Sequence, residues 1–171
     1  MGGLTAVVTE TAMGWAGVAL SERGIRHATL FHRREASARG ELRAVGAAES
    51  PGVGGSEVAA LLRSYAAGED VSLDDYPVDL PECSEMQRAI WLALREIPRG
   101  ETRSYGWLAR HVGHGDAPRA IGAAVGANPI PLWLPCHRVV ASDGSLHGFG
   151  GGLAMKQALL ELEGALPRRM V

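Results

Sequence analysis

The sequence predicts an α+β protein, with some α/β character, built from two domains. Residues 1–80 are expected to form a small antiparallel sheet domain with a helix, and residues 81–171 a mostly α-helical domain that holds Cys136. Short β-prone runs separated by turn residues fill the first part, whereas helical spacing with cap residues dominates the second. An acidic segment, residues 69–81, is expected to connect the two.

Three short runs predict the strands of the sheet: Leu4–Val8, Trp15–Leu20 and Ile25–Phe31. The clearest turn is Ser21-Glu22-Arg23-Gly24, which predicts a hairpin between the second and third runs. These signals favour sequential antiparallel pairing.

The rest of the first domain carries weaker signals. Arg34 to Gly55 is rich in Ala, Gly, Ser and charge without a firm period, so we expect a loop with at most a helical turn. Ser56 can then cap a helix, since apolar residues follow at helical spacing. They are Val58, Leu61, Leu62 and Tyr65.

The second domain opens with a well-marked helix. Ser84, with Gln87 three residues later, predicts a capping box, and Pro98-Arg99-Gly100 marks the end. The expected buried stripe is Met86, Ile90, Leu94 and Ile97.

Two shorter helices follow and predict a helix-turn-helix of winged-helix-like type. The first begins at Ser104 and keeps helical spacing to Gly113; Asp116 can cap the second, which runs to about Ala127. On the second, Ala117, Ala120, Ile121 and Ala124 can face the core, and Arg119, Gly122, Ala123 and Gly126 lie on another side. That side either permits tight helix packing or lets a nucleic-acid backbone approach closely.

Composition narrows the class of protein. With 46% hydrophobic and 21% charged residues, the chain is expected to be globular, and no apolar run is long enough for a membrane span. The start of the sequence lacks the basic residues of a secretory signal. Two cysteines, Cys83 and Cys136, do not suggest a disulfide framework, so we expect a reducing, cytoplasmic location.

The net charge of −2 hides a basic segment. Between Arg88 and Arg138 seven arginines face three acids. This excess is either a solvated surface or a face that contacts phosphates.

A thiol beside an imidazole is the strongest chemical feature. After an expected strand over Ile130–Leu134 comes Pro135-Cys136-His137-Arg138-Val139-Val140. A cysteine reacts as the thiolate, so a base or a positive field must lower its pKa. Neighbouring side chains on a strand point to opposite sides, so His137 would act through a water or after a local bend. A structural, buried cysteine is the alternative.

Glu163 is the candidate partner of His137. A helix is expected over Leu153–Gly164, and Glu163 follows Leu159 and Leu160 by four and three residues, which turns it toward the apolar side. A Glu–His–Cys relay would fix the imidazole tautomer and favour the thiolate. In the alternative, Glu163 ends the helix at the surface.

At these residues the sequence resembles the alkylguanine-DNA alkyltransferase family. The resemblance covers residues 84–164 in order and spacing, and the first eighty residues fit only loosely. The matching positions are Ser104-Tyr105, Arg119-Ala120, Gly126-Ala127-Asn128-Pro129, Pro135-Cys136-His137-Arg138-Val139-Val140, Gly151-Gly152-Leu153-Ala154 and Glu163-Gly164.

The resemblance implies catalytic roles. Cys136 would accept an alkyl group from O6 of a flipped-out guanine in a single turnover, with His137 as base through a water and Glu163 orienting it. Asn128 would support the adjacent turn, and Tyr105 would donate a hydrogen bond to the guanine ring.

It also implies contacts to the substrate and to DNA. The carbonyls of Cys136 and Val139 would accept from the guanine amino group, Phe149 would line the pocket and the Gly150 N–H would contact O6. Arg119 would fill the gap left by the nucleotide. The other DNA-binding positions are Ser104, Arg110, Ala120 and Gly126.

Some positions depart from the family. Phe149 stands where many members have Tyr, and Gly150 where some have Ser, so hydroxyls near O6 are missing. The N-terminal half has no cysteine before Cys83, so we expect no metal, and no cofactor is implied.

The expected partner is double-stranded DNA that contains O6-alkylguanine. We expect the protein to bind it as a monomer and not to associate with a membrane. Acceptance of O4-alkylthymine and cooperative binding stay open. The alternatives are a lesion-binding relative without transfer activity and a Cys-His hydrolase that regenerates its thiol.

Overall fold

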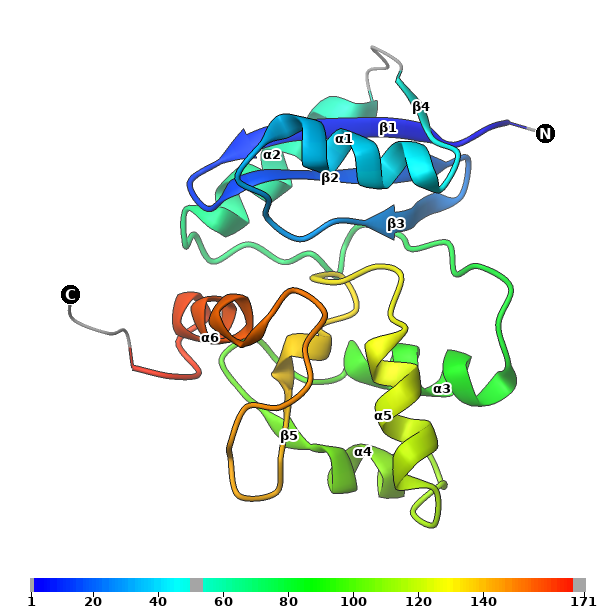
Figure 1. Cartoon of the computed structure of the whole chain (residues 1–171), viewed down its shortest axis with the longest axis vertical. Coiled ribbons are helices and arrows are strands. Elements are labelled where there is room, and N and C mark those ends of the chain that lie inside the picture. Colours follow the sequence, from blue (N-terminus) through cyan, green and yellow to red (C-terminus); the bar gives the residue numbers. More distant parts are fainter. Residues whose placement is uncertain (1, 50–53, 168–171) are drawn as a thin grey trace. The chain divides into compact units, whose positions relative to one another are not determined.

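The computed structural model describes residues 2–49 and 54–167 and divides the chain into two compact units, Met1–Pro81 and Glu82–Val171. Each unit has its own layers, visible in Figure 1. No helix in the described ranges is both long and apolar enough to span a membrane.

The first unit is built on a four-stranded sheet in the order β3-β2-β1-β4. Strands β1 (Thr5–Thr11), β2 (Gly14–Ser21) and β3 (Gly24–Ala28) pair antiparallel, and the β2–β3 hairpin turns at Ser21 to Gly24 as expected. The α+β class and the antiparallel core of the sheet are confirmed. The fourth strand, β4 (Ala48–Glu49), pairs parallel with β1 and was not expected.

The expected loop over 34–55 was wrong, because it contains the helix α1 (Glu35–Ala44) as well as β4. Its residues are good helix formers, and Arg39 pairs with Glu35 one turn earlier. Only Ala38 and Leu42 are buried, so the apolar stripe is too narrow to stand out in the sequence. Here tertiary packing, not periodicity, makes the helix.

Helices cover both faces of the sheet, with α1 in front in Figure 1 and α2 (Gly54–Ala66) behind. Leu42 of α1 lies so close to Gly17 that a Cβ on Gly17 would come within 2.9 Å of the Leu42 side chain and would also clash with the Val7 carbonyl oxygen. On the opposite face, Arg63 of α2 donates to the Thr9 hydroxyl at 2.9 Å. Strand β2, which packs against both helices, is therefore buried along its middle. Helix α2 begins at Gly54, so Ser56 is not its cap.

The segment expected to be a connector belongs partly to the first unit. Ile25 bridges Val78, and Asp79 is buried against the Ser21 hydroxyl and the Arg26 guanidinium, which lies 2.8 Å from its carboxylate. The Ser21 hydrogen bond, followed by the Arg26 charge, holds the pKa of Asp79 below its usual value although burial opposes this. These contacts fix the chain up to the end of the unit.

The second unit packs four helices around an irregular turn. They are α3 (Glu85–Leu94), α4 (Tyr105–His111), α5 (Pro118–Gly126) and α6 (Leu153–Leu162). The capping box of Ser84 and Gln87 is present, and Ser104 caps α4, both as predicted. Asp116 does not cap α5: the N-cap is Ala117, and Pro118, whose missing N–H costs nothing there, takes the first helical position.

The core face of α5 differs in part from the expected one. Ile121 and Ala124 are buried as predicted, but Val125 completes the buried set, while Ala117 and Ala120 stay partly exposed. Trp91 of α3 fastens this helix, since its indole N–H donates to the Ala124 carbonyl at 2.8 Å.

The predicted strand over Ile130–Leu134 is wrong. These residues form consecutive turns, in which Leu132 has a positive φ of 75°. Asn128 holds the turns: its amide donates to the Leu134 carbonyl at 2.6 Å, and its side-chain oxygen accepts from the Ile130 N–H at 2.9 Å. A short apolar run fits a strand or another conformation equally well by sequence, and here Pro131, Pro135 and the side-chain hydrogen bonds of Asn128 decide its conformation.

Candidate active site

Cys136 and His137 lie on a 3₁₀ turn, η1 (Cys136–Arg138), rather than on a strand. The turn continues into β6 (Val139–Val140), which pairs parallel with β5 (Arg103–Ser104). Arg103 pairs with Val139 and Ser104 pairs with Val140. This pairing places Tyr105, the first residue of α4, beside the turn. The local bend thus replaces the alternating geometry expected of a strand.

Glu163 is buried and faces His137, so the alternative of a surface position is wrong. Its Oε1 lies 2.9 Å from His137 Nε2. The two atoms are as close as those of an ion pair. The Nε2–H bond does not point straight at the oxygen, however, so the two groups do not form a linear hydrogen bond. A carboxylate only accepts, so this contact assigns the ring proton to Nε2. Nδ1 is buried and has no hydrogen-bond partner among residues 2–49 and 54–167.

Arg138 completes the cluster and was missed as a site residue. Its guanidinium donates to both Glu163 oxygens at 2.9 Å and to the Ile97 carbonyl at 2.6 Å. The residue is 8% exposed, so it adds nothing to a basic surface, contrary to its place in the predicted arginine segment. The need of a buried Glu163 for a cationic partner was the signal that could have identified it.

The charges of the cluster follow from burial and pairing. Burial raises the pKa of Glu163, but His137 and Arg138 outweigh it and hold the pKa well below its ordinary value. Burial lowers the pKa of His137, with Arg138 and Lys156 adding to the effect and Glu163 opposing it. The imidazole is therefore neutral at neutral pH and can accept a proton at Nδ1.

The Cys136 thiol is also shaped by burial, which raises its pKa. The Asn128 side chain, the Lys156 charge and backbone N–H groups oppose that shift without cancelling it. Burial likewise raises the pKa of Tyr105, and the charge of Cys136 adds to this, so the two side chains share one environment. The thiol stays protonated until a base removes its proton.

The structure thus brings together Cys136, His137, Glu163, Asn128 and Tyr105. Val139 follows directly on β6. Phe149 and Gly150 lie in the loop between β6 and α6, Phe149 partly buried and Gly150 exposed. The Tyr105 hydroxyl donates to the His147 carbonyl of this loop at 3.4 Å.

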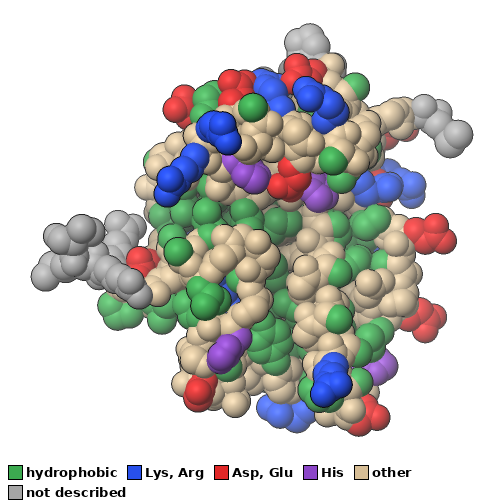
Figure 2. Space-filling model, viewed as in Figure 1, with side chains coloured by type: hydrophobic (Ala, Val, Ile, Leu, Met, Phe, Trp, Pro, Cys, Tyr) green, Lys and Arg blue, Asp and Glu red, His purple; other side chains and the backbone are tan. Residues whose placement is uncertain are grey.

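The residues predicted to meet DNA lie on the helix pair α4–α5. Arg110 on α4 and Arg119 on α5 are exposed, Ala120 is partly buried and Ser104 is the helix cap. Gly126 and Gly122 of α5 face open space, since a Cβ at either would meet no atom of the described chain within 4 Å. Tight helix packing therefore does not explain these glycines. The space-filling view shows mostly backbone and apolar side chains over α5 (Figure 2).

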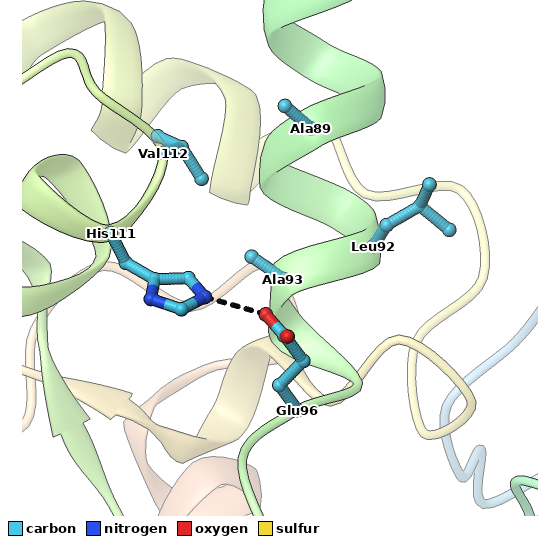
Figure 3. Close-up of a pocket in the computed structure, with 6 residues that line it drawn as sticks. All are labelled: Ala89, Leu92, Ala93, Glu96, His111 and Val112. Atoms are coloured by element: carbon cyan, nitrogen blue, oxygen red, sulfur yellow. Dashed lines mark hydrogen bonds and ion pairs between the residues drawn. The ribbon is translucent and has the colours of Figure 1, made fainter.

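A surface hollow between α3 and α4 is separate from this cluster. Ala89, Leu92, Ala93 and Val112 line it, and the His111–Glu96 pair, 2.6 Å apart, spans it (Figure 3). It contains neither cysteine and none of the residues above. Among the described residues, no group of His, Cys, Asp and Glu has the arrangement of a metal site.

Comparisons with known proteins decide the family. The family profile "6-O-methylguanine DNA methyltransferase, DNA binding domain" matches residues 85–165. The methylated-DNA–protein-cysteine methyltransferase of Methanosarcina acetivorans is 46% identical over 110 residues, which are 64% of this chain and 69% of that protein. The chain belongs to the methylated-DNA–protein-cysteine methyltransferase family. The resemblance predicted from the sequence is confirmed.

Other members of this methyltransferase family extend the match. The Mycolicibacterium paratuberculosis methyltransferase is 50% identical over 103 residues, spanning 60% of this chain and 61% of its own length. The crystal structure of the Mycobacterium tuberculosis O6-methylguanine methyltransferase superposes with a TM-score of 0.77 at 36% identity, covering 95% of this chain and 93% of that one. A second structure of that protein, in complex with DNA, has a TM-score of 0.76 at 34% identity and covers 94% and 93% of the two chains. The likeness therefore includes the N-terminal unit, where the sequence resemblance was loose.

The open face of α5 gives a first prediction. Gly122→Ala should stabilise the second unit by about 0.5–1 kcal/mol, since alanine is the better helix former and its Cβ meets nothing. If DNA lies against α5, the same methyl group should weaken duplex binding severalfold. Thermal unfolding and a fluorescence binding titration measure the two effects. Gly40→Ala in α1, also in open space, is the matched control and should raise stability alone. If Gly122→Ala binds duplex DNA with unchanged affinity, DNA does not lie against this face of α5.

The buried His137 gives a second prediction, which concerns the pH dependence of stability. Its pKa is lowered in the folded state, so the unfolded chain takes up a proton that the folded chain refuses. Stability should therefore fall as the pH drops below about 6.5, where the imidazole of the unfolded chain becomes protonated. Glu163, whose pKa is lowered, stabilises the fold above about pH 4.3, and that contribution is lost as pH falls further. Denaturant unfolding at several pH values measures this, and His137→Gln should flatten the curve between pH 7 and 5.5. An unflattened curve would mean that His137 is not the group responsible.

Proposed function

We propose that this protein repairs O6-alkylguanine in double-stranded DNA by moving the alkyl group irreversibly to Sγ of its own Cys136. The observation that carries the proposal is the buried Cys136–His137–Glu163 arrangement beside the helix pair α4–α5. Family membership supports transfer to a protein cysteine. The lesion, the acceptor and the single turnover are the parts to be tested.

The reaction begins with loss of the thiol proton. Neutral His137 accepts it at Nδ1 through a water, and Glu163, 2.9 Å from Nε2, stabilises the imidazolium that forms. Arg138 keeps Glu163 ionised and in place through its two hydrogen bonds. This set explains how a thiol with a raised pKa becomes a nucleophile.

Transfer is then a displacement at the alkyl carbon. The Sγ–C bond forms as the C–O6 bond breaks, and the electron pair of that bond stays with the guanine. The Tyr105 hydroxyl donates a hydrogen bond to an acceptor atom of the guanine ring, which makes the base a better leaving group. The freed guanine takes up one proton, which balances the proton that Cys136 lost through the water to His137. The product is a thioether, which no group in the site can cleave, and each molecule reacts once.

A guanine inside a duplex must leave the stack before Sγ can reach it, at a cost of a few kcal/mol. The α5 face suits this step, because Arg119 is exposed on a helix whose neighbouring positions are small. We assign Arg119 to the gap left by the nucleotide, and Ser104, Arg110, Ala120 and Gly126 to the adjoining DNA surface. Val139, Phe149 and Gly150 would line the pocket for the flipped base. The protein would act as a monomer without a cofactor in the cytoplasm.

Arg119 can be tested separately from the chemistry. Arg119→Ala should slow repair in duplex DNA at least about tenfold, because extrusion then lacks its replacement side chain. Reaction with the free alkylated base, which needs no extrusion, should change little. Single-turnover rates on the two substrates give the ratio, with Arg88→Ala, an exposed arginine on α3, as control. Equal losses on both substrates would rule out the wedge role.

The proposal is tested by counting turnovers. The protein is mixed with a tenfold excess of duplex carrying one O6-methylguanine, and restored guanine is counted per protein. One guanine per protein is expected. More than one would indicate a hydrolase that regenerates its thiol. Tight binding with none restored would indicate a recognition protein without transfer activity.

A further inference from the structure

Lys156 is a buried base that the reaction described above does not use. It is the only lysine in the chain, and its side chain is fully buried on α6. It precedes Leu159 and Leu160 by three and four residues and so lies on the same stripe of the helix as Glu163. A buried ammonium is costly unless it is paired or hydrogen-bonded.

Its hydrogen bonds go to backbone carbonyls. Nζ donates to the Val139 carbonyl at 2.6 Å and to the His147 carbonyl at 3.1 Å. The same His147 carbonyl accepts from the Tyr105 hydroxyl, and Nζ lies 5.8 Å from the centre of the Tyr105 ring. One ammonium thus joins β6, the loop before α6 and the start of α4.

Its charge acts on the reacting sulfur. Burial lowers the pKa of Lys156, while a negative charge at Cys136 opposes that shift. The reciprocal effect is that Lys156 favours the thiolate of Cys136. Packing alone does not account for this choice of residue, because a methionine would fill the same volume without a buried charge.

We propose that Lys156 is a positioning residue for alkyl transfer, which holds the His147 loop against Val139 and Tyr105 and stabilises the developing thiolate of Cys136. The inference rests on the proposed function. Lys156 gives up no proton in the step: the thiol proton goes toward His137, and the ammonium offsets the charge left on Sγ until the Sγ–C bond removes it.

Three variants test this role: Lys156→Met, Lys156→Arg and the control Arg88→Met, which removes an exposed charge from the same unit. The pH profile of Cys136 alkylation by iodoacetamide is measured in a Cys83→Ala background, together with single-turnover transfer at saturating duplex. Lys156→Met should move the thiol titration to higher pH by about one unit and slow transfer at least about tenfold at pH 7. The loss should shrink at high pH, where the thiol ionises unaided, and Lys156→Arg should recover part of the rate. Equal loss at every pH with an unmoved thiol titration would overturn the role.

The single lysine allows a test without mutating it. Isotope-labelled lysine gives one side-chain NMR signal, which should show an inflection at the thiol titration of Cys136 and lose it in Cys136→Ala. If the NMR signal of Lys156 shows no inflection at the thiol titration of Cys136, the inference is overturned. This holds even if Lys156→Met does not fold. If wild-type protein transfers no methyl group, the proposed function fails. If it transfers one and the thiol is independent of Lys156, only this inference fails.

Discussion

Replacing Cys136 by Ala should abolish methyl transfer, lowering its rate by more than about 10³-fold, while duplex binding stays within about twofold of wild type. The side chain is 8% exposed and lies on η1, whereas the predicted DNA contacts lie on α4 and α5. Removing one sulfur atom therefore removes the acceptor and leaves the binding surface. Methyl transfer from a labelled duplex and a parallel binding titration measure the two properties.

The matched control is Cys83→Ala, since Cys83 is the other free cysteine and is partly exposed. It should transfer at the wild-type rate. Residual transfer in Cys136→Ala, or its loss in Cys83→Ala, would mean that the wrong cysteine has been assigned.

Glu163→Gln should have the next largest effect, on both stability and rate. The amide cannot neutralise Arg138, so a buried guanidinium is left without its counter-charge, which typically costs about 3–5 kcal/mol. It also cannot stabilise an imidazolium at His137, so transfer should slow by about 10²–10⁴-fold. Denaturant unfolding and single-turnover kinetics at a temperature where the variant is folded give the two numbers.

Glu161→Gln, on the same helix and paired with Gln157, is the control and should change either property little. Wild-type stability in Glu163→Gln would show that the Glu163–Arg138 pair contributes nothing. A wild-type rate would show that His137 needs no carboxylate.

Much of the second unit was predictable because its signals are local. The Ser84–Gln87 capping box and the Ser104 cap depend on a few adjacent residues, and both occur as predicted. The burial of Glu163 followed from its spacing to Leu159 and Leu160. Spacing on a helix determines which side chains share a face, and that was enough to pair Glu163 with His137.

The same spacing predicts that Lys156 is buried, since it precedes Leu159 and Leu160 by three and four residues. As the only lysine of a chain with 17 basic residues, and on the apolar stripe of α6, it carried a signal equal to that of Glu163. Arg138 was likewise read as part of a surface charge because its burial depends on a contact with Glu163, 25 residues away. The residues around Arg138 do not show this pairing; only the need of the buried Glu163 for a cationic partner indicates it.

The misplaced elements share a cause. Helix α1 and strand β4 depend on packing against the sheet, and the turns after Asn128 depend on its side-chain hydrogen bonds to Leu134 and Ile130. In each case tertiary contacts decide between conformations that the local residues leave close in free energy.

The position of the methyl group after the reaction tests whether Cys136 is the acceptor. The protein is incubated with duplex DNA carrying O6-methylguanine and is then digested. The masses of its peptides are measured by mass spectrometry. We expect one methyl group per protein, on the buried Cys136 and not on the more accessible Cys83. A methyl group on any other residue, or restored guanine with no methylated peptide, would contradict it.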